Sequence, residues 1–98
     1  MDGIQVIAEP RRRRILELVW DEEMSAGEIA SAFPVTFGAI SQHLGVLRKS
    51  GFVDVRAVGN QRFYRANKEA LGPLRPVLEA MWAETLEDLA KTIESEQS

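Results

Sequence analysis

The first amphipathic pattern along the chain predicts a helix over residues 9–23. Ile15, Leu18 and Val19 recur at i, i+3 and i+4, so they share one face of that helix. Pro10 suits the first helical turn, because its missing N–H leaves no hydrogen bond unmade there. Arginines at positions 11–14 point to every side of the helix, so at least one of them must lie near the packed face. The pattern leaves open whether this run meets solvent or phosphate.

Two further helices are predicted close behind the first. Ser25 and Glu28 match the S-x-x-E capping box that marks a helix start, and Pro34 ends this short helix. Thr36 is a second N-cap candidate, and a longer helix follows over residues 36–49. Two helices joined by such a short turn form a helix-turn-helix. The apolar positions of the pair are Ile29, Ala30 and Phe33, then Ile40, Leu44 and Leu47.

The helix over residues 36–49 has an outer face that differs from an ordinary solvated one. Gly38, Gln42, Gly45 and Lys49 point away from its apolar positions. The Glu/Lys pairs that usually cover a solvated helix face are missing. Because small side chains let the helix backbone approach a flat or grooved surface, this face is a candidate contact surface.

An alternating pattern after Gly51 predicts a two-stranded ribbon. Residues 53–56 alternate apolar and charged, as a half-buried strand does, and Gly51 is a helix C-cap candidate. Residues 58–61 contain Gly and Asn and form a turn, and residues 62–66 return as a second strand. A ribbon with a polar, basic tip directly after a helix-turn-helix is a wing. The predicted fold is therefore mainly α with a small β-hairpin, a winged helix-turn-helix.

The last apolar stripe predicts a helix over about residues 74–93. A helix of that length is roughly 30 Å long, which is more than the small domain before it can cover. A stripe left exposed favours aggregation unless a partner covers it, and the simplest partner is a second copy related by a two-fold axis. Alternatively, part of the stripe folds back on the chain's own core. The residues expected between the two copies are Ile4, Ile7, Leu74, Leu78, Met81, Trp82, Leu86, Leu89 and Ile93.

Length and composition exclude several classes of protein. The chain has 98 residues, the size of one domain, and no linker or repeat divides it, so residues 1–98 are expected to form a single domain. No apolar run approaches the roughly 20 residues that span a bilayer, and the N-terminus lacks a signal-peptide layout, so we expect a cytoplasmic protein. The chain has no cysteine and a single histidine, which removes disulfides, thiolate sites and multi-histidine metal cages.

The distribution of charge changes what the net charge suggests. A formal net charge of −3 argues against a nucleic-acid partner. Residues 36–68, however, carry six basic side chains and one acidic side chain, whereas residues 69–98 carry two basic and seven acidic ones. A basic segment between acidic flanks is the electrostatic footprint that a phosphate-binding surface needs. Such clusters also occur on ordinary solvated surfaces, so charge alone does not decide the partner.

Three segments together resemble one known family. Residues 9–18 (EPRRRRILEL), 41–53 (SQHLGVLRKSGFV) and 59–64 (GNQRFY) are similar, in order and spacing, to the opening helix, the S-x-H-L signature and the wing of ArsR-type winged-helix transcriptional regulators. The resemblance implies a homodimeric repressor that binds a double-stranded DNA operator, often its own. Metal-sensing members carry a Cys-x-Cys-like motif on the first helix of the helix-turn-helix, or His/Asp/Glu clusters on the last helix. Because residues 28–32 hold no thiol and the last helix holds no histidine, we expect no metal and no cofactor.

The resemblance also assigns residues to the DNA. Phe37, Gly38, Ser41 and Gln42 match the groove-facing positions, and the amide of Gln42 can pair with adenine in the major groove. Phe37 either meets thymine methyl groups or packs within the domain. The residues expected to contact phosphates are Thr36, Arg48, Lys49, Arg56 and Arg62. Asn60 and Gln61, at the tip of the wing, are expected beside the minor groove. His43 either packs within the domain or contacts a phosphate.

Two other classes of function compete with DNA binding. One is a protein-interaction module whose basic face docks an acidic partner, but the bare outer face of residues 36–49 lacks the aromatic anchors that such interfaces favour. The other is an enzyme, for which the sequence offers no Gly-rich phosphate loop and no nucleophile paired with a base. We therefore expect a protein without catalytic activity. The operator and any small-molecule effector are not identified by the sequence.

Overall fold

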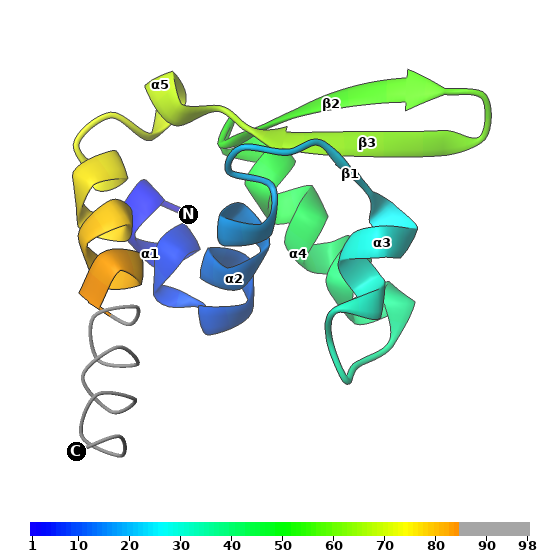
Figure 1. Cartoon of the computed structure of the whole chain (residues 1–98), viewed down its shortest axis with the longest axis horizontal. Coiled ribbons are helices and arrows are strands. Elements are labelled where there is room, and N and C mark those ends of the chain that lie inside the picture. Colours follow the sequence, from blue (N-terminus) through cyan, green and yellow to red (C-terminus); the bar gives the residue numbers. More distant parts are fainter. Residues whose placement is uncertain (85–98) are drawn as a thin grey trace, which may run out of the picture.

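The computed structural model describes residues 1–84. Its elements follow the order α1 (Gly3–Ala8), α2 (Pro10–Leu18), β1 (Met24–Ser25), α3 (Ala26–Ser31), α4 (Phe37–Lys49), β2 (Val53–Val58), β3 (Gln61–Ala66) and α5 (Lys68–Leu71). Residues 74–84 are helical again. Figure 1 shows the β2–β3 hairpin along one side of the helices, while α1 and the helix of residues 74–84 lie at the end opposite to the hairpin tip. The predicted winged helix-turn-helix is confirmed.

The two helices of the helix-turn-helix begin where their caps predict. The Ser25 hydroxyl accepts from the Glu28 N–H at 3.1 Å, and the Glu28 carboxylate accepts from the Ser25 N–H at 3.0 Å. The hydroxyl of Thr36 accepts from the Ala39 N–H at 3.1 Å, so α4 starts at the next residue. Each such cap stabilises the helix start by about 1 kcal/mol. Because these contacts are local, the sequence was sufficient to place both helix starts.

The helix predicted over residues 9–23 is shorter than expected, and this prediction was wrong at its C-terminal end. Helix α2 ends at Leu18, and the Val19 carbonyl accepts a hydrogen bond from the Ala66 N–H at 2.9 Å. Met24 and Ser25 then pair with Tyr64 and Phe63, which makes a three-stranded antiparallel sheet in the order β1-β3-β2. A two-residue strand is too short to show a periodic pattern, so only its distant partner strand defines it.

The hairpin presents two different faces. Opposite residues of an antiparallel pair share a face, and successive residues alternate between faces. Tyr64, opposite Val55, is buried in the core, so the face that it shares with Arg62 is the one toward the helices. Arg56 is opposite Phe63 and lies on the other face. Gly59, with φ +59°, is the first of two loop residues between the strands, as a type II′ hairpin turn requires.

The N-terminal helix α1 is held in place by the arginine run of α2. The last carbonyls of a helix have no partner within the helix. Here the guanidinium of Arg12 donates to the carbonyls of Val6 at 2.7 Å and Gln5 at 3.2 Å. The guanidinium of Arg13 donates to the carbonyls of Ile7 at 2.8 Å and Ala8 at 3.0 Å. Two of the four arginines therefore cap a neighbouring helix, which the sequence pattern did not reveal.

One apolar core joins all of these elements. It contains residues from α1 and α2, from both helices of the helix-turn-helix, from the sheet and from the helix of residues 74–84. Its fully buried large side chains are Val6, Ile15, Leu16, Val19, Ile29, Ile40, Leu47, Leu71 and Leu78. Within residues 1–84, no helix is both long enough and apolar enough to cross a membrane.

The arginine caps predict a measurable loss of stability. Replacing both Arg12 and Arg13 by Gln should lower the free energy of unfolding by about 1–3 kcal/mol, because four carbonyls lose charged donors. Urea denaturation followed by circular dichroism measures this change. The matched control is Arg11→Gln with Arg14→Gln, which removes the same charge from the same helix. An equal loss in both variants would contradict the capping role.

Candidate nucleic-acid interface

Helix α4 turns one side into the core and leaves the other exposed. Ile40, Leu44 and Leu47 are each at most 2% exposed. The predicted contact residues of the opposite side and of the helix ends are exposed: Thr36, Phe37, Gly38, Ser41, Gln42, Arg48 and Lys49. Phe37 is 58% exposed, so packing inside the domain does not account for it. The structure therefore brings these residues together on one accessible surface, which we call the α4 face.

The α4 face is low in profile, as the sequence predicted. A β-carbon added at Gly45 would meet no other atom within 4 Å, and one at Gly38 would meet only the Thr36 hydroxyl at 3.9 Å. Neither glycine has a positive φ, so neither is required by the backbone conformation. The two glycines leave room beside the helix, which a closely approaching partner can use.

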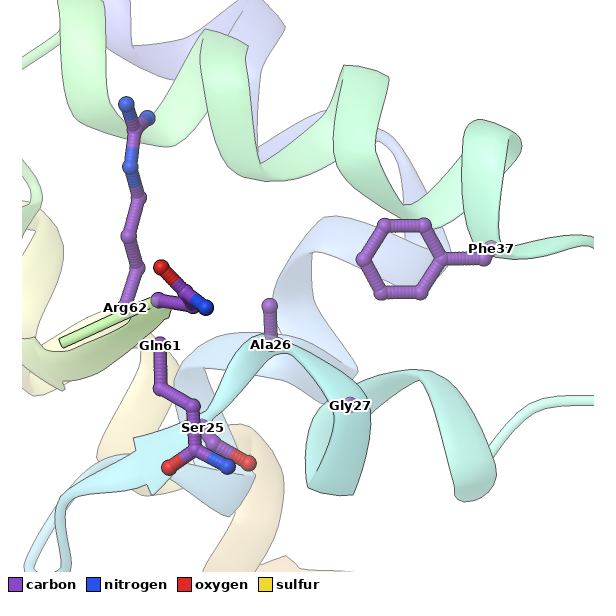
Figure 2. Close-up of a pocket in the computed structure, with 7 residues that line it drawn as sticks. Ser25, Ala26, Gly27, Phe37, Gln61 and Arg62 are labelled. Atoms are coloured by element: carbon purple, nitrogen blue, oxygen red, sulfur yellow. The ribbon is translucent and has the colours of Figure 1, made fainter.

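A hollow of about 240 Å³ separates the start of α4 from the wing. It is lined by Ser25, Ala26, Gly27, Phe37, Asn60, Gln61 and Arg62, and Figure 2 shows these side chains around it. In that view Gln61 and Arg62 extend in opposite directions from β3, and Arg62 extends toward the side of α4. The sequence pointed to Phe37 and the wing tip, but it missed Ser25, Ala26 and Gly27. Only the fold brings this helix start beside the wing.

Arg56 lies apart from the other predicted phosphate contacts. Its guanidinium donates to the two carboxylate oxygens of Glu23 at 3.1 Å and 2.6 Å, and it lies 5.3 Å from the centre of the Phe63 ring. The hydrogen bond from Arg56 lowers the pKa of the Glu23 carboxyl, and the same bond raises the pKa of Arg56. Glu23 therefore competes with a phosphate for Arg56, whereas Arg62 has no ion pair among those found within residues 1–84.

His43 is half-buried on α4, facing the start of α2. Burial lowers the pKa of His43, Glu9 opposes this effect, and Arg12 and Arg11 lower the pKa further. The imidazole is therefore neutral at pH 7, so it brings no positive charge to a phosphate. Of the two interpretations left open by the sequence, this environment favours packing.

The surface expected between two copies is only partly exposed in the single chain. Ile4 is 70% exposed and Met81 is 39% exposed. Ile7 and Leu78, by contrast, are buried in the chain's own core at 8% and 0% exposure, so they offer almost no surface to a partner. Trp82 is partly buried against Trp20, with ring centres 4.8 Å apart in an edge contact. The predicted residues Leu86, Leu89 and Ile93 lie outside the described residues.

An apolar groove of about 410 Å³ runs between α1 and the chain that follows α5. It is lined by Asp2, Gly3, Ile4, Phe52, Ala70, Leu71, Pro73 and Leu74. The predicted interface residue Leu74 therefore lies beside Ile4. Within residues 1–84, no cluster of three or more His, Cys, Asp or Glu side chains is arranged to hold a metal ion.

Comparisons with known proteins give this geometry a context. The family model described as "Bacterial regulatory protein, arsR family" matches residues 9–55. The HTH-type transcriptional regulator Rv2034 of Mycobacterium tuberculosis is 36% identical over 94% of this chain and 86% of that protein. The biofilm growth-associated repressor of Agrobacterium fabrum is 31% identical over 88% of this chain and 74% of that protein.

A solved structure with the same fold is also similar in sequence. It is the solution structure of the homodimeric winged helix-turn-helix DNA-binding domain Mb0332 from Mycobacterium bovis, described as a possible ArsR-family transcriptional regulator. It matches with a TM-score of 0.70 and 27% identity, over 84% of this chain and 76% of that one. The sequence match, the shared fold and the exposed α4 face agree. The chain belongs to the arsR family of bacterial regulatory proteins and is a DNA-binding transcriptional regulator of the winged helix-turn-helix type.

Proposed function

We propose that the protein is a repressor that binds a double-stranded operator as a homodimer, with α4 in the major groove. The observation that carries this proposal is the α4 face, a slim exposed surface of hydroxyl and amide groups next to Arg48 and Lys49. B-DNA's major groove is about 12 Å wide and admits an α-helix. In this proposal the protein binds DNA in the cytoplasm and catalyses no reaction. Residues 1–98 act as one domain.

Gln42 is the residue that we propose for reading bases. It is exposed in the middle of α4, where a helix comes closest to the floor of the groove. Its side-chain N–H can donate to adenine N7 while its carbonyl oxygen accepts from the adenine N6 amino group, so the pair distinguishes adenine from the other bases. Ser41 beside it hydrogen-bonds either a base edge or a phosphate. The basic groups at the end of α4 and Arg62 on the wing contact phosphates, which fixes the register.

The proposal of a homodimer rests on the exposed apolar surface around Ile4 and on the homodimeric state printed for the Mb0332 domain. A two-fold axis near α1 and the helix of residues 74–84 would place the two wings at opposite ends of the pair. The two α4 helices then read half-sites about 34–36 Å apart, in an inverted repeat. We infer repression because a dimer on such a site excludes other proteins from the same DNA, and a relative is named a repressor.

Replacing Gln42 by Ala tests the proposed reading of bases. Q42A should bind a duplex selected by the wild type about 1–3 kcal/mol more weakly, because the pair with adenine is lost. Binding to an unrelated duplex should change little. Fluorescence anisotropy at several salt concentrations measures both.

Arg48→Gln is the matched contrast for that titration, because Arg48 is proposed to contact phosphate. This substitution should weaken binding to both duplexes by the same factor. It should also lower the magnitude of the slope of log K against log salt by about 0.9. If Q42A loses the same affinity for both duplexes, Gln42 does not read bases. Wild-type binding that does not depend on salt would contradict DNA binding as a whole.

Replacing Ile4 by Glu tests the proposed dimer. The wild type should sediment as a dimer of the 11.0 kDa chain, and I4E should shift toward the monomer because a charge is placed in the apolar surface. The matched control is Val58→Glu, an apolar position on the wing that is 48% exposed. A monomeric wild type, or equal shifts in both variants, would contradict this interface.

The ion pair between Glu23 and Arg56 predicts that Glu23 weakens DNA binding. Glu23→Gln releases Arg56 for phosphate, so affinity for any duplex should rise by roughly two- to fivefold, the range of one exposed pair. Glu22→Gln removes the same charge from the neighbouring exposed position and is the control. If both variants bind alike, Arg56 does not reach the DNA.

A further inference from the structure

A second pocket, of about 240 Å³, lies where α2 meets the helix of residues 74–84. Its lining combines basic, acidic, aromatic and sulfur-containing side chains: Pro10, Arg13, Arg14, Glu17, Met81 and Trp82. No residue of the α4 face or of the wing lines it. Pockets for drug-sized ligands measure roughly 300–1,000 Å³, so this smaller pocket suits a compound of one or two rings.

Arg13 is a half-buried cation of this pocket, and it has no carboxylate partner among the ion pairs found in residues 1–84. Its Nη1 donates to the carbonyls of Ile7 at 2.8 Å and Ala8 at 3.0 Å. The hydrogen bonds found in that part of the chain use neither its Nε nor its Nη2. A guanidinium has five N–H donors and can bind a carboxylate through two parallel hydrogen bonds. Because charges removed from water are normally paired, the free donors of Arg13 point to an anionic ligand.

The other two charged groups of the pocket neutralise each other. Nη1 of Arg14 lies 2.5 Å from Oε1 of Glu17, one turn further along α2, and both side chains are exposed. Glu17 is the only acid among the six lining residues. The net positive charge of the pocket therefore comes from Arg13.

Trp82 and Met81 form the apolar side of the pocket. Trp82 is partly buried and meets Trp20 edge-on, with ring centres 4.8 Å apart, so the core holds its ring in place. Aromatic rings pack favourably on one another, and the sulfur of methionine contacts rings favourably. Pro10 adds a further apolar surface from the first turn of α2. This side of the pocket therefore fits a flat ring.

We propose that this pocket binds a small aromatic carboxylate, with the carboxylate on Arg13 and the ring against Trp82 and Met81. A neutral aromatic compound leaves the charge of Arg13 unpaired, and an inorganic anion gains nothing from the apolar side. The two parts of the lining therefore select the two parts of the ligand. This inference goes beyond the proposed function, and it can be tested in the absence of DNA.

Fluorine NMR of 4-fluorobenzoate, titrated with the wild-type protein, measures this binding. The acid should bind saturably and about tenfold or more tighter than 4-fluorobenzyl alcohol, which has the same ring without the charge. Inorganic phosphate at the same concentration should not displace it. Equal binding of acid and alcohol, or no saturable binding, would overturn the proposal. Displacement by phosphate would show a general anion site and would overturn the aromatic part.

Arg13→Gln should weaken binding of 4-fluorobenzoate by about tenfold, because the paired cation is lost. Arg11→Gln is the matched control, since it removes the same charge from an exposed position of the same helix that does not line the pocket. It should bind as the wild type does. Equal affinities of the two variants would show that Arg13 does not hold the carboxylate.

Glu17→Gln tests the pocket by a gain of binding, which a loss of folding cannot imitate. Arg13→Gln also removes caps of α1, so this second variant is needed. Removing the only acid of the lining should strengthen binding of 4-fluorobenzoate by about two- to fivefold, the range of one exposed charge pair. Glu22→Gln removes an exposed acid that does not line the pocket and should change nothing. Equal affinities of these two variants would place the ligand elsewhere.

Discussion

The burial of one side of α4 is the constraint on which the rest of the surface depends. Ile40, Leu44 and Leu47 lie in the core against Ile29 and the residues of α2. Full burial of such a side chain stabilises the fold by about 1.5–3 kcal/mol, so three of them fix the rotation of the helix. Because positions on a helix are related by a fixed angle, the same three residues decide that Ser41 and Gln42 face outward. The contact surface is thus a consequence of core packing.

Charge is distributed over this scaffold by local pairing. The acidic loop before β1 engages two cations of the later chain: Glu23 binds Arg56, and Asp21 binds Lys68 at 2.7 Å. Arg12 and Arg13 are committed to the carbonyls of α1. A count of charged residues in the sequence treats all of these groups as equal, but only some of them have an ion-pair or hydrogen-bond partner within the chain. The cations on the α4 face and Arg62 have no ion pair among those found in residues 1–84.

The fold connects the surface proposed for pairing of two copies with the surface proposed for binding DNA. Helix α1, which carries Ile4, lies at the end opposite to the hairpin tip, and one core contains residues of α1, α4 and the hairpin. Trp82 meets Trp20 edge-on, and Lys68 lies 5.2 Å from the centre of the Trp20 ring, so Trp20 contacts both the last described helix and the first residue of α5. The surface proposed for pairing and the α4 face are therefore joined through one core.

The sequence by itself determined whatever depends on near neighbours. Capping at Ser25 and Thr36, the apolar face of α4 and the alternation along the hairpin are properties of a few consecutive residues, and each was predicted. Tertiary structure decided what depends on distant partners. The early end of α2, the strand β1, the arginine caps of α1 and the hollow that includes Gly27 all join residues far apart in the chain or in different elements. No local pattern encodes such contacts, because their energy exists only once the chain has packed.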